Sequence, residues 1–403
     1  MSKFLRVMMA AMAAGAMVAA DATPADATPA ATAAEATPIP VGPDKARVEA
    51  LIDAAQTWLL SQQQANGGFM PGNQFVLGIT ALSAEALATA PKAMPADQGP
   101  VAKALALLLS QQQADGGIYS QTEGLGNYTT SITLMALAAA GKLDANKEAV
   151  QKAQHYLFGL QRTDDPSGLR NGGIGYDQTH GPGHEDLTYT NAAIMGLRAS
   201  GIATDDPHML AALAFIQRCQ NLSSVNPAPW AAKNDGSGVY SPDETKAGQS
   251  WQSPADKADP TLRLDGTGSM TYSLLESYLA LDLKPGDPRV DAALAWVKVH
   301  FQFDGNPGMA AGKEHQGLFY YYVFMGKTLD LLHLQSIEIA PDLSEDWRLG
   351  LFNAINRHAT MVDVAGKPGA MWINDAPRWG EGLPQLGTVY MLKALKVIDA
   401  GLP

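Results

Sequence analysis

The sequence has little cysteine, few aromatic residues and few charges. Cys219 is the only cysteine among the 403 residues, so an intrachain disulfide is excluded. Only 7% of the residues are aromatic and 17% are charged, whereas 46% are hydrophobic and alanine is abundant. This composition favours many closely packed helices over sheets. The sequence therefore predicts an all-α protein.

Two further absences limit the partners of the chain. The formal net charge is −12 and no basic stripe occurs, which excludes nucleic acid and anionic lipid surfaces as expected partners. Beyond the N-terminus, no apolar run is both long enough and free enough of charge to span a bilayer. We therefore expect no transmembrane span after the N-terminal segment is removed.

The N-terminal segment resembles an export signal. Lys3 and Arg6 precede an apolar run over residues 7–18, and Val18-Ala19-Ala20 provides small residues for cleavage. We expect residues 1–20 to be a signal peptide of a periplasmic or extracellular protein, and an uncleaved membrane anchor is the alternative. Losing the two basic residues would change the formal charge to −14. Residues 21–43 are almost wholly Ala, Thr, Pro and Asp, which predicts a disordered linker before a single domain over 44–403.

A sequence repeat organises the rest of the chain. Gln62-Gln63-Gln64-Ala65-Asn66-Gly67-Gly68 recurs as Gln111-Gln112-Gln113-Ala114-Asp115-Gly116-Gly117, a period of 49 residues. This period accommodates a helix, a Gly-Gly turn and a second helix. We expect the amides of Gln62 and Gln111 to bond the backbone of the turn.

Amphipathic and uniformly apolar helices alternate along the chain. Amphipathic outer helices are predicted over 47–63, 100–112, 147–161, 207–219, 288–301 and 346–360, and apolar inner helices over 75–88, 128–140, 187–200, 270–280, 317–332 and 384–400. A helix that is apolar all round must be buried all round. Six such hairpins predict an (α/α)6 toroid, with an inner ring of six helices within an outer ring of six. An open solenoid is the alternative.

Charged residues interrupt the inner helices. They are Glu85, Glu276, Lys327, Asp330 and Lys393. Unpaired charges are too costly to bury, so we expect these residues to pair or to face a central cavity. A structural pair between Glu276 and Lys327 is favoured over a catalytic role. Cys219 is expected to be a packing residue.

These features resemble the prenyltransferase and squalene-cyclase superfamily of α/α toroids. The resemblance covers about residues 47–398 and is carried by the turns in which Gln, after a short gap, is followed by Asx-Gly-Gly. The segment from Leu318-Phe319-Tyr320-Tyr321-Tyr322 to Asp330, followed by Asp346-Trp347-Arg348 and Ala370-Met371-Trp372, is similar to bacterial members. The resemblance implies an isoprenoid ligand.

The catalytic motifs of that superfamily are missing. The Asp-x-Asp-Asp motif of squalene-type cyclases does not occur, and Met270-Thr271-Tyr272-Ser273 lacks the cysteine of the prenyltransferase zinc site. We therefore expect neither a metal nor a cofactor, and we transfer no catalytic residue from the family.

The loops before the inner helices are the best candidates for a site. In an alternating ring they all emerge at one end, where the helix N-termini favour anionic groups. The loop over 179–186 is the richest, with two histidines and two acids. Candidate catalytic residues are Glu185, Asp186 and Asp265, although Glu185 or Asp186 could simply cap the next helix. Candidate ligand-binding residues are His180, His184, Tyr189, Tyr272, His315, Tyr320, Tyr321, Asp375 and Trp379.

Two functions remain open on the sequence alone. The favoured one is a toroid that binds a hydrophobic or isoprenoid molecule or acts as a protein scaffold. The alternative is an enzyme that uses carboxylates at the mouth of the ring on an isoprenoid or a saccharide. A toroid like the complement thioester domains is a weaker hypothesis, because their Cys-Gly-Glu-Gln sequence is missing. The lining of the central cavity distinguishes these functions.

Overall fold

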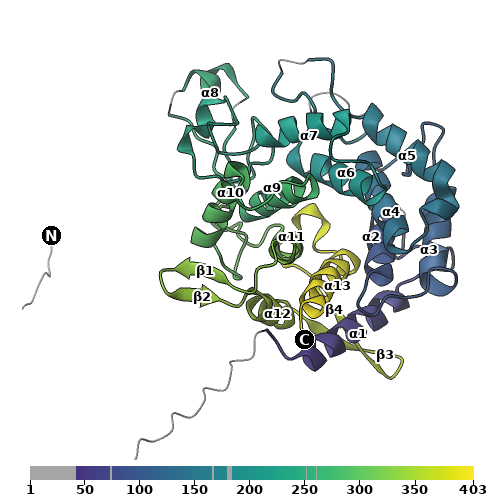
Figure 1. Cartoon of the computed structure of the whole chain (residues 1–403). Helices are drawn as coiled ribbons and strands as arrows, with labels where there is room; N and C mark the ends of the chain where they lie inside the picture. Colours follow the sequence, from purple (N-terminus) through teal and green to yellow (C-terminus); the bar gives the residue numbers. More distant parts are fainter. Residues whose placement is uncertain (1–41, 73–74, 166–167, 179–183, 251, 260) are drawn as a thin grey trace, which may run out of the picture. The chain divides into compact units, whose positions relative to one another are not determined.

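Helices dominate the described part of the chain. The computed structural model describes residues 42–72, 75–165, 168–178, 184–250, 252–259 and 261–403, which lie in one compact unit (Figure 1). The predicted signal peptide and nearly all of the predicted linker, and His180, lie outside the described residues. Within the described residues, no helix is both long and apolar enough to cross a membrane.

The described helices alternate between an outer and an inner set. The outer helices are α1 (Lys45–Ser61), α3 (Gly99–Ser110), α5 (Lys147–Gly159), α7 (Pro207–Gln217), α10 (Pro288–Val299) and α12 (Trp347–Arg357). The inner helices are α2 (Val76–Ala88), α4 (Gly126–Ala139), α6 (Leu187–Ala199), α9 (Gly268–Ala280), α11 (Leu318–Leu331) and α13 (Pro384–Ala400). The predicted helices all occur, with ends displaced by at most three residues.

The inner helices form a closed ring. Each packs against the next, from α2 through α4, α6, α9 and α11 to α13, and α13 packs back against α2. The first outer helix, α1, covers the last inner helix, α13, so the chain ends meet at one seam (Figure 1). The contact between α13 and α2 confirms the (α/α)6 toroid and overturns the open solenoid, whose end helices would not meet.

Aspartates start four of the outer helices. Asp44, Asp206, Asp287 and Asp346 each accept a backbone N–H of the first turn. The buried side of each outer helix packs on the inner ring, while the other side faces solvent, as the amphipathic pattern predicts. The inner helices are buried on nearly every side.

In each of the first four units, one glutamine ties the unit to the next. The Nε2 of Gln112 donates to Gly116 O at 2.9 Å, inside its own turn, and to Ala149 O at 2.9 Å, in the next outer helix. Gln63, Gln161 and Gln220 make the same pair of bonds. The prediction for Gln62 and Gln111 was therefore wrong by one position. Each of those two residues follows the helix end, and its amide bonds a neighbouring serine instead.

The turns also need glycine for steric reasons. Gly116 has φ +94°, and a Cβ there would lie 2.4 Å from Lys152 O of the next outer helix. Gly67, Gly172 and Gly236 stand in the same relation to the following outer helix. Glycine thus allows both the backbone reversal and the close approach of two units.

Two β-hairpins and a short helix were not predicted. Strands β1 (Ile337–Ala340) and β2 (Leu343–Glu345) pair antiparallel before α12. Strands β3 (Thr360–Val364) and β4 (Lys367–Met371) pair with Thr360 opposite Met371. The second hairpin replaces the glycine turn of the sixth unit and packs against α1 at the seam. The insertion of the fourth unit carries α8 (Pro254–Ala258).

The charges of the inner helices pair as expected. Lys327 Nζ lies 2.5 Å from Glu276 Oε1, which confirms the predicted structural pair. Lys393 Nζ lies 2.7 Å from Glu85 Oε2 and links α13 to α2 across the seam. Asp330 instead pairs with Arg348 of α12, at 2.6 Å.

Candidate functional site

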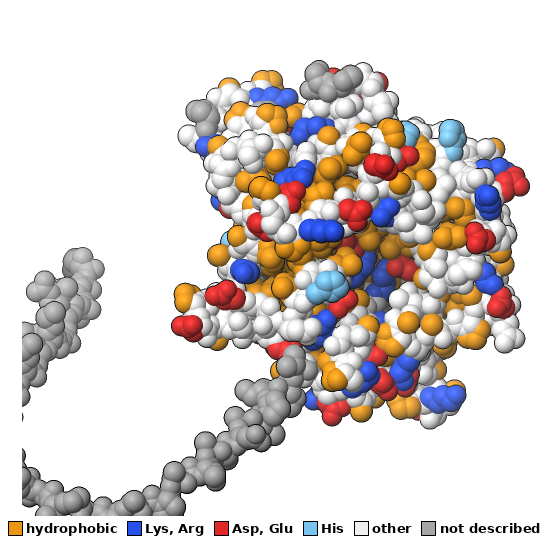
Figure 2. All heavy atoms as spheres, viewed as in Figure 1, with side chains coloured by type: hydrophobic (Ala, Val, Ile, Leu, Met, Phe, Trp, Pro, Cys, Tyr) orange, Lys and Arg blue, Asp and Glu red, His pale blue; other side chains and the backbone are white. Residues whose placement is uncertain are grey.

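A central cavity opens among the starts of the inner helices and the loops that precede them. Its volume is about 540 Å³. The inner helices all contribute to its lining, as do the loops of units three, four and six. Figure 2 shows one face of the molecule, hollowed near the middle of the ring, with acidic, basic and apolar side chains around the hollow. This position agrees with the end of the ring that the alternating topology predicts.

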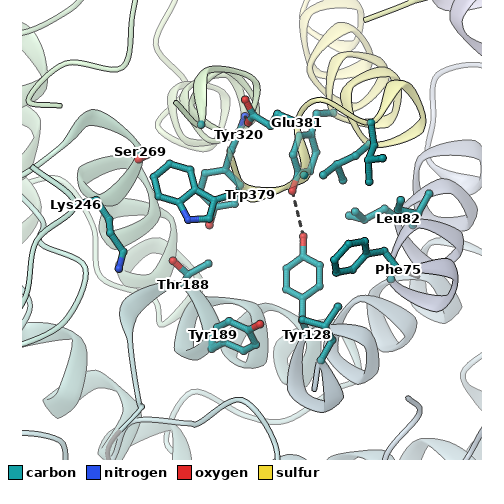
Figure 3. A pocket seen from close by; sticks show the side chains of 18 of the residues that line it. Phe75, Leu82, Tyr128, Thr188, Tyr189, Lys246, Ser269, Tyr320, Trp379 and Glu381 are labelled. Carbon is teal, nitrogen blue, oxygen red and sulfur yellow. Dashed lines mark hydrogen bonds between the residues drawn. The ribbon is translucent and has the colours of Figure 1, made fainter. Parts of the chain in front are cut away.

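Tyrosines make most of the polar contribution to an otherwise apolar wall. The tyrosines that line the cavity are Tyr128, Tyr176, Tyr189, Tyr240, Tyr320 and Tyr390. The rings of Tyr176 and Tyr189 lie 3.8 Å apart between centroids, and Tyr189 lies 6.2 Å from Tyr128. Tyr128 and Tyr390 approach across the cavity with 3.5 Å between their hydroxyl oxygens (Figure 3). The wall is thus a nearly continuous aromatic belt that suits flat or branched hydrocarbon.

A layer of charged side chains adjoins the aromatic belt on the side of the C-terminal ends of the inner helices, which we call the lower side. A second cavity of about 40 Å³ shares Tyr128, Tyr320 and Tyr390 with the first and is also lined by Glu276, Lys327 and Lys393. Burial lowers the pKa of Lys393, whereas the nearby Glu276 raises that of Lys327 above its usual value in spite of burial. The paired charges close the ring centre beneath the main cavity without leaving a bare charge in the apolar wall.

Glu381 is a buried carboxyl at the cavity wall. It lies in the loop before α13, near Tyr320 (Figure 3). Its Oε1 accepts the backbone N–H of Tyr320 at 2.8 Å. Its Oε2 accepts from Phe319 N at 3.3 Å and from the amide of Asn374 at 2.5 Å. Glu381 therefore caps α11, where Gly317 has no side chain to do so. Burial raises the pKa of this carboxyl to about 7, although the N–H donors oppose that shift.

Asp186 anchors a pair of tyrosine hydroxyls on the opposite side. It is 1% exposed, and its Oδ1 accepts the backbone N–H of Tyr189 at 2.9 Å as the cap of α6. Its Oδ2 accepts the hydroxyl of Tyr240, whose oxygen lies 2.5 Å from that of Tyr176. Burial raises the pKa of Asp186 in spite of these bonds.

The structure places three of the predicted ligand-binding residues at the cavity. Tyr189, Tyr320 and Trp379 line it. The indole of Trp379 lies among the other lining side chains, on a loop residue with φ +58° (Figure 3). The three come from different units, which the ring brings together.

The other described candidates lie away from the lining. Tyr272 and Tyr321 are buried in the core, with ring centroids 5.7 Å apart. His315 and Asp375 bond each other at 3.2 Å near the surface. His184 is exposed, and its ring lies nearly perpendicular to that of Tyr176, with 6.3 Å between the centroids.

The predicted catalytic carboxylates are spread over three environments, and none of these three described residues is part of the lining. Asp186 is a helix cap behind the tyrosine pair. Asp265 bonds Lys233 at 2.7 Å and Gln249 at 2.9 Å on the outside of the fourth unit. Glu185 is buried, with Arg162 at 3.9 Å. Asp186 is thus the one that can influence the cavity, through Tyr240.

The sequence prediction missed several lining residues that carry polar groups. Tyr176 and Tyr240 occupy equivalent positions, two residues after the bridges that Ile174 and Gly238 make in their turns. That shared repeat position could have pointed to them. Lys246 comes from the insertion of the fourth unit, where no repeat pattern indicates its place. Among the described residues, no cluster of three or more His, Cys, Asp or Glu side chains is arranged to hold a metal.

One protein-family model matches the part of the chain that contains the first three inner helices, α2, α4 and α6. The model of the family described as squalene-hopene cyclase C-terminal domain matches residues 75–234, from the start of α2 to the turn after α7. The resemblance to the squalene-cyclase superfamily is confirmed. Beyond the matched residues, the helices α9, α11 and α13 complete the squalene-cyclase-like ring.

Solved structures show the same fold over most of the chain. The ligand-free type II terpene cyclase MstE from Scytonema is similar with a TM-score of 0.52 and 15% identity, over 89% of this chain and 99% of that one. A protein from Actinoplanes is similar with a TM-score of 0.50 and 14% identity, over 88% and 99%. No curated protein matches the sequence significantly. At these identities the squalene-cyclase-like toroid shares its fold with these proteins.

Proposed function

We propose that this squalene-cyclase-like toroid binds an apolar molecule of the isoprenoid class in its central cavity. The observation that carries the proposal is the aromatic belt around about 540 Å³. Such a volume lies within the usual range for small-molecule sites, roughly 300–1,000 Å³. A saccharide would leave most of its hydroxyls without partners against this wall, so the cavity supports the isoprenoid over the sugar.

Direct binding tests the proposal. Geranylgeraniol delivered from cyclodextrin is titrated into the protein while tryptophan fluorescence is followed, because Trp379 lines the cavity. We expect a saturable change. No saturable binding across polyprenyl alcohols, squalene and hopanoids would refute an isoprenoid function and favour a scaffold.

Gly78 offers a variant that fills the cavity. It lies on the lining, and a Cβ placed there would have Thr129 Oγ1 as its nearest neighbour, at 3.8 Å. A Cβ at this position therefore meets no clash, and we expect the larger side chain of Gly78→Leu to fill part of the cavity and abolish binding. Gly159→Leu, on the exposed side of α5, is the matched control, because no atom lies within 4 Å of its Cβ position. Equal binding by both variants would place the ligand elsewhere.

Glu381 supports a second candidate function, acid catalysis on the bound molecule. A carboxylic acid that keeps its proton near neutral pH can protonate a carbon–carbon double bond and receive a proton back when the resulting cation collapses to a new alkene. The aromatic belt would stabilise that cation. Cyclised or isomerised product should then appear at low pH and decline as the pH rises through about 7. Glu381→Gln that turns over geranylgeraniol or squalene as the wild type does would exclude this role.

Export is a further part of the proposal. The basic start, apolar run and small residues of 1–20 support a cleaved signal. The protein is expressed in a bacterial host that exports proteins and cleaves their signal peptides. N-terminal sequencing should then show a mature chain that begins after Ala20. A chain that keeps Met1 and stays membrane-associated would favour the anchor.

A further inference from the structure

The hydroxyl pair of Tyr176 and Tyr240 is a polar site within the apolar wall. Both residues line the cavity, and their hydroxyl oxygens lie 2.5 Å apart. Each comes from the turn of its own unit, at equivalent repeat positions, so the packing of units three and four places two phenols side by side. An apolar ligand alone makes no use of such a pair.

Asp186 determines which hydrogen bonds this pair can offer. Its Oδ1 is held by the N–H of Tyr189 at 2.9 Å, so its Oδ2 is fixed toward the hydroxyl of Tyr240. When Asp186 is ionised, Tyr240 donates to it and Tyr176 donates within the cluster, which leaves phenol lone pairs for a donor from the cavity. When Asp186 is protonated, it supplies one more proton, and a phenol O–H becomes available to an acceptor. An alcohol fits both states, because a hydroxyl group both donates and accepts.

We propose that the ligand is an oxygenated isoprenoid whose hydroxyl group is bound by the Tyr176–Tyr240 pair, backed by Asp186, while its hydrocarbon lies along the aromatic belt. The proposal rests on the binding function proposed above and narrows its ligand class. A site that hydrogen-bonds a hydroxyl discriminates against the analogue that lacks it, because the buried polar groups then lose a partner.

Lys246 is the competing polar group. Its Nζ lies 3.4 Å from the centroid of the Tyr240 ring and 2.8 Å from Glu244 Oε1, and it also lines the cavity. An ammonium would attract an anionic head group rather than an alcohol. Lys246→Met therefore separates the two recognition modes.

The test compares geranylgeraniol with the hydrocarbon in which hydrogen replaces its hydroxyl. We expect the wild type to bind the alcohol about tenfold more tightly than the hydrocarbon. Tyr240→Phe and Tyr176→Phe should each remove most of that preference by weakening alcohol binding, with hydrocarbon binding unchanged. Lys246→Met should keep the preference.

Tyr119→Phe is the matched control. Tyr119 also donates its hydroxyl to an aspartate, Asp115, at 2.7 Å, in the turn of the second unit, but it is not one of the lining residues. It should bind both probes as the wild type does. Equal affinity of the wild type for alcohol and hydrocarbon would overturn the hydroxyl site and leave the binding function intact, whereas failure to bind either probe would overturn both. Loss of the preference in Lys246→Met alone would also overturn the proposal.

Discussion

At the scale of single residues, Glu381 combines a structural and a chemical role. It caps α11 through the backbone N–H groups of Phe319 and Tyr320, and it lines the cavity. Its folded-state pKa of about 7 lies above the usual value of 4.5. Between these two values the folded protein keeps a proton that the unfolded chain has released, so the free energy of unfolding falls as the pH rises from about 4.5 to 7.

Glu381→Gln removes this pH dependence. We expect the wild type to lose on the order of 3 kcal/mol of stability relative to the variant over that interval, which urea denaturation at several pH values measures. Glu314 is an exposed carboxylate on the neighbouring loop, and backbone N–H groups lower its pKa. Glu314→Gln is therefore a control that should keep the fall in stability between pH 4.5 and 7. Parallel curves for wild type and Glu381→Gln would show that the carboxyl of Glu381 titrates normally.

The pair of Glu276 and Lys327 supports a second residue-scale prediction. Glu276 is fully buried, and its second oxygen accepts from Asn191 at 3.1 Å. Lys327→Met should cost about 3 kcal/mol of unfolding free energy, because it leaves a buried carboxylate without its counter-ion. Adding Glu276→Gln should recover most of the loss. A double-mutant cycle by chemical denaturation measures this coupling, and additive effects of the two changes would contradict it.

At the scale of elements, Gln63, Gln112, Gln161 and Gln220 hold one unit to the next, because each bonds its own turn and the next outer helix. We call each of these paired bonds a glutamine clamp. Gln112→Ala leaves two backbone carbonyls, Gly116 O and Ala149 O, without their donor. We expect a loss of about 1–3 kcal/mol in the free energy of unfolding. Gln111→Ala removes only a 3.3 Å bond to Ser110 Oγ and should stay within about 0.5 kcal/mol of the wild type. Equal losses at both positions, measured by denaturation, would show that the clamp has no special role.

The elements also show how far sequence predicts this structure. Helix periodicity and the glycine turns predicted all twelve ring helices, because amphipathic outer helices alternate with apolar inner ones. The hairpin of β3 and β4 was missed, since it replaces the glycine turn that marks the earlier units. The spacing also placed the clamp one residue too early, because the helix end shifts which glutamine reaches the turn.

The candidate site was only partly predictable for a related reason. An inner helix that is apolar all round carries no periodic signal for the side that faces the ring axis. Tyr320 and Tyr321 are neighbours in sequence, yet Tyr320 lines the cavity and Tyr321 bonds Gln302 O in the core. Only the packing of adjacent helices decides between them. Tyr176 and Tyr240 likewise meet only because units three and four are neighbours in the ring.

At the scale of the whole molecule, closure makes the two ends of the chain depend on each other. The helix α1 packs on α13 and on the β3–β4 hairpin, and Lys45 Nζ donates to Leu402 O at 3.0 Å. In an open solenoid each repeat contacts only its neighbours, so an end repeat can fray alone. In the ring, loss of α1 packing uncovers the last inner helix and hence the wall of the cavity.

Matched isoleucine substitutions test this dependence. Ile52 in α1 and Ile194 in α6 are both fully buried, one at the seam and one in the middle of the chain. We expect each Ile→Ala change to lower the free energy of unfolding by about 2–5 kcal/mol, with a single transition by circular dichroism and by tryptophan fluorescence. A ring that behaves as one cooperative unit requires both variants to unfold in this way. If Ile52→Ala instead gave an early partial transition and left the main one in place, the seam would be a fraying end, and ligand binding at the cavity would not depend on ring closure.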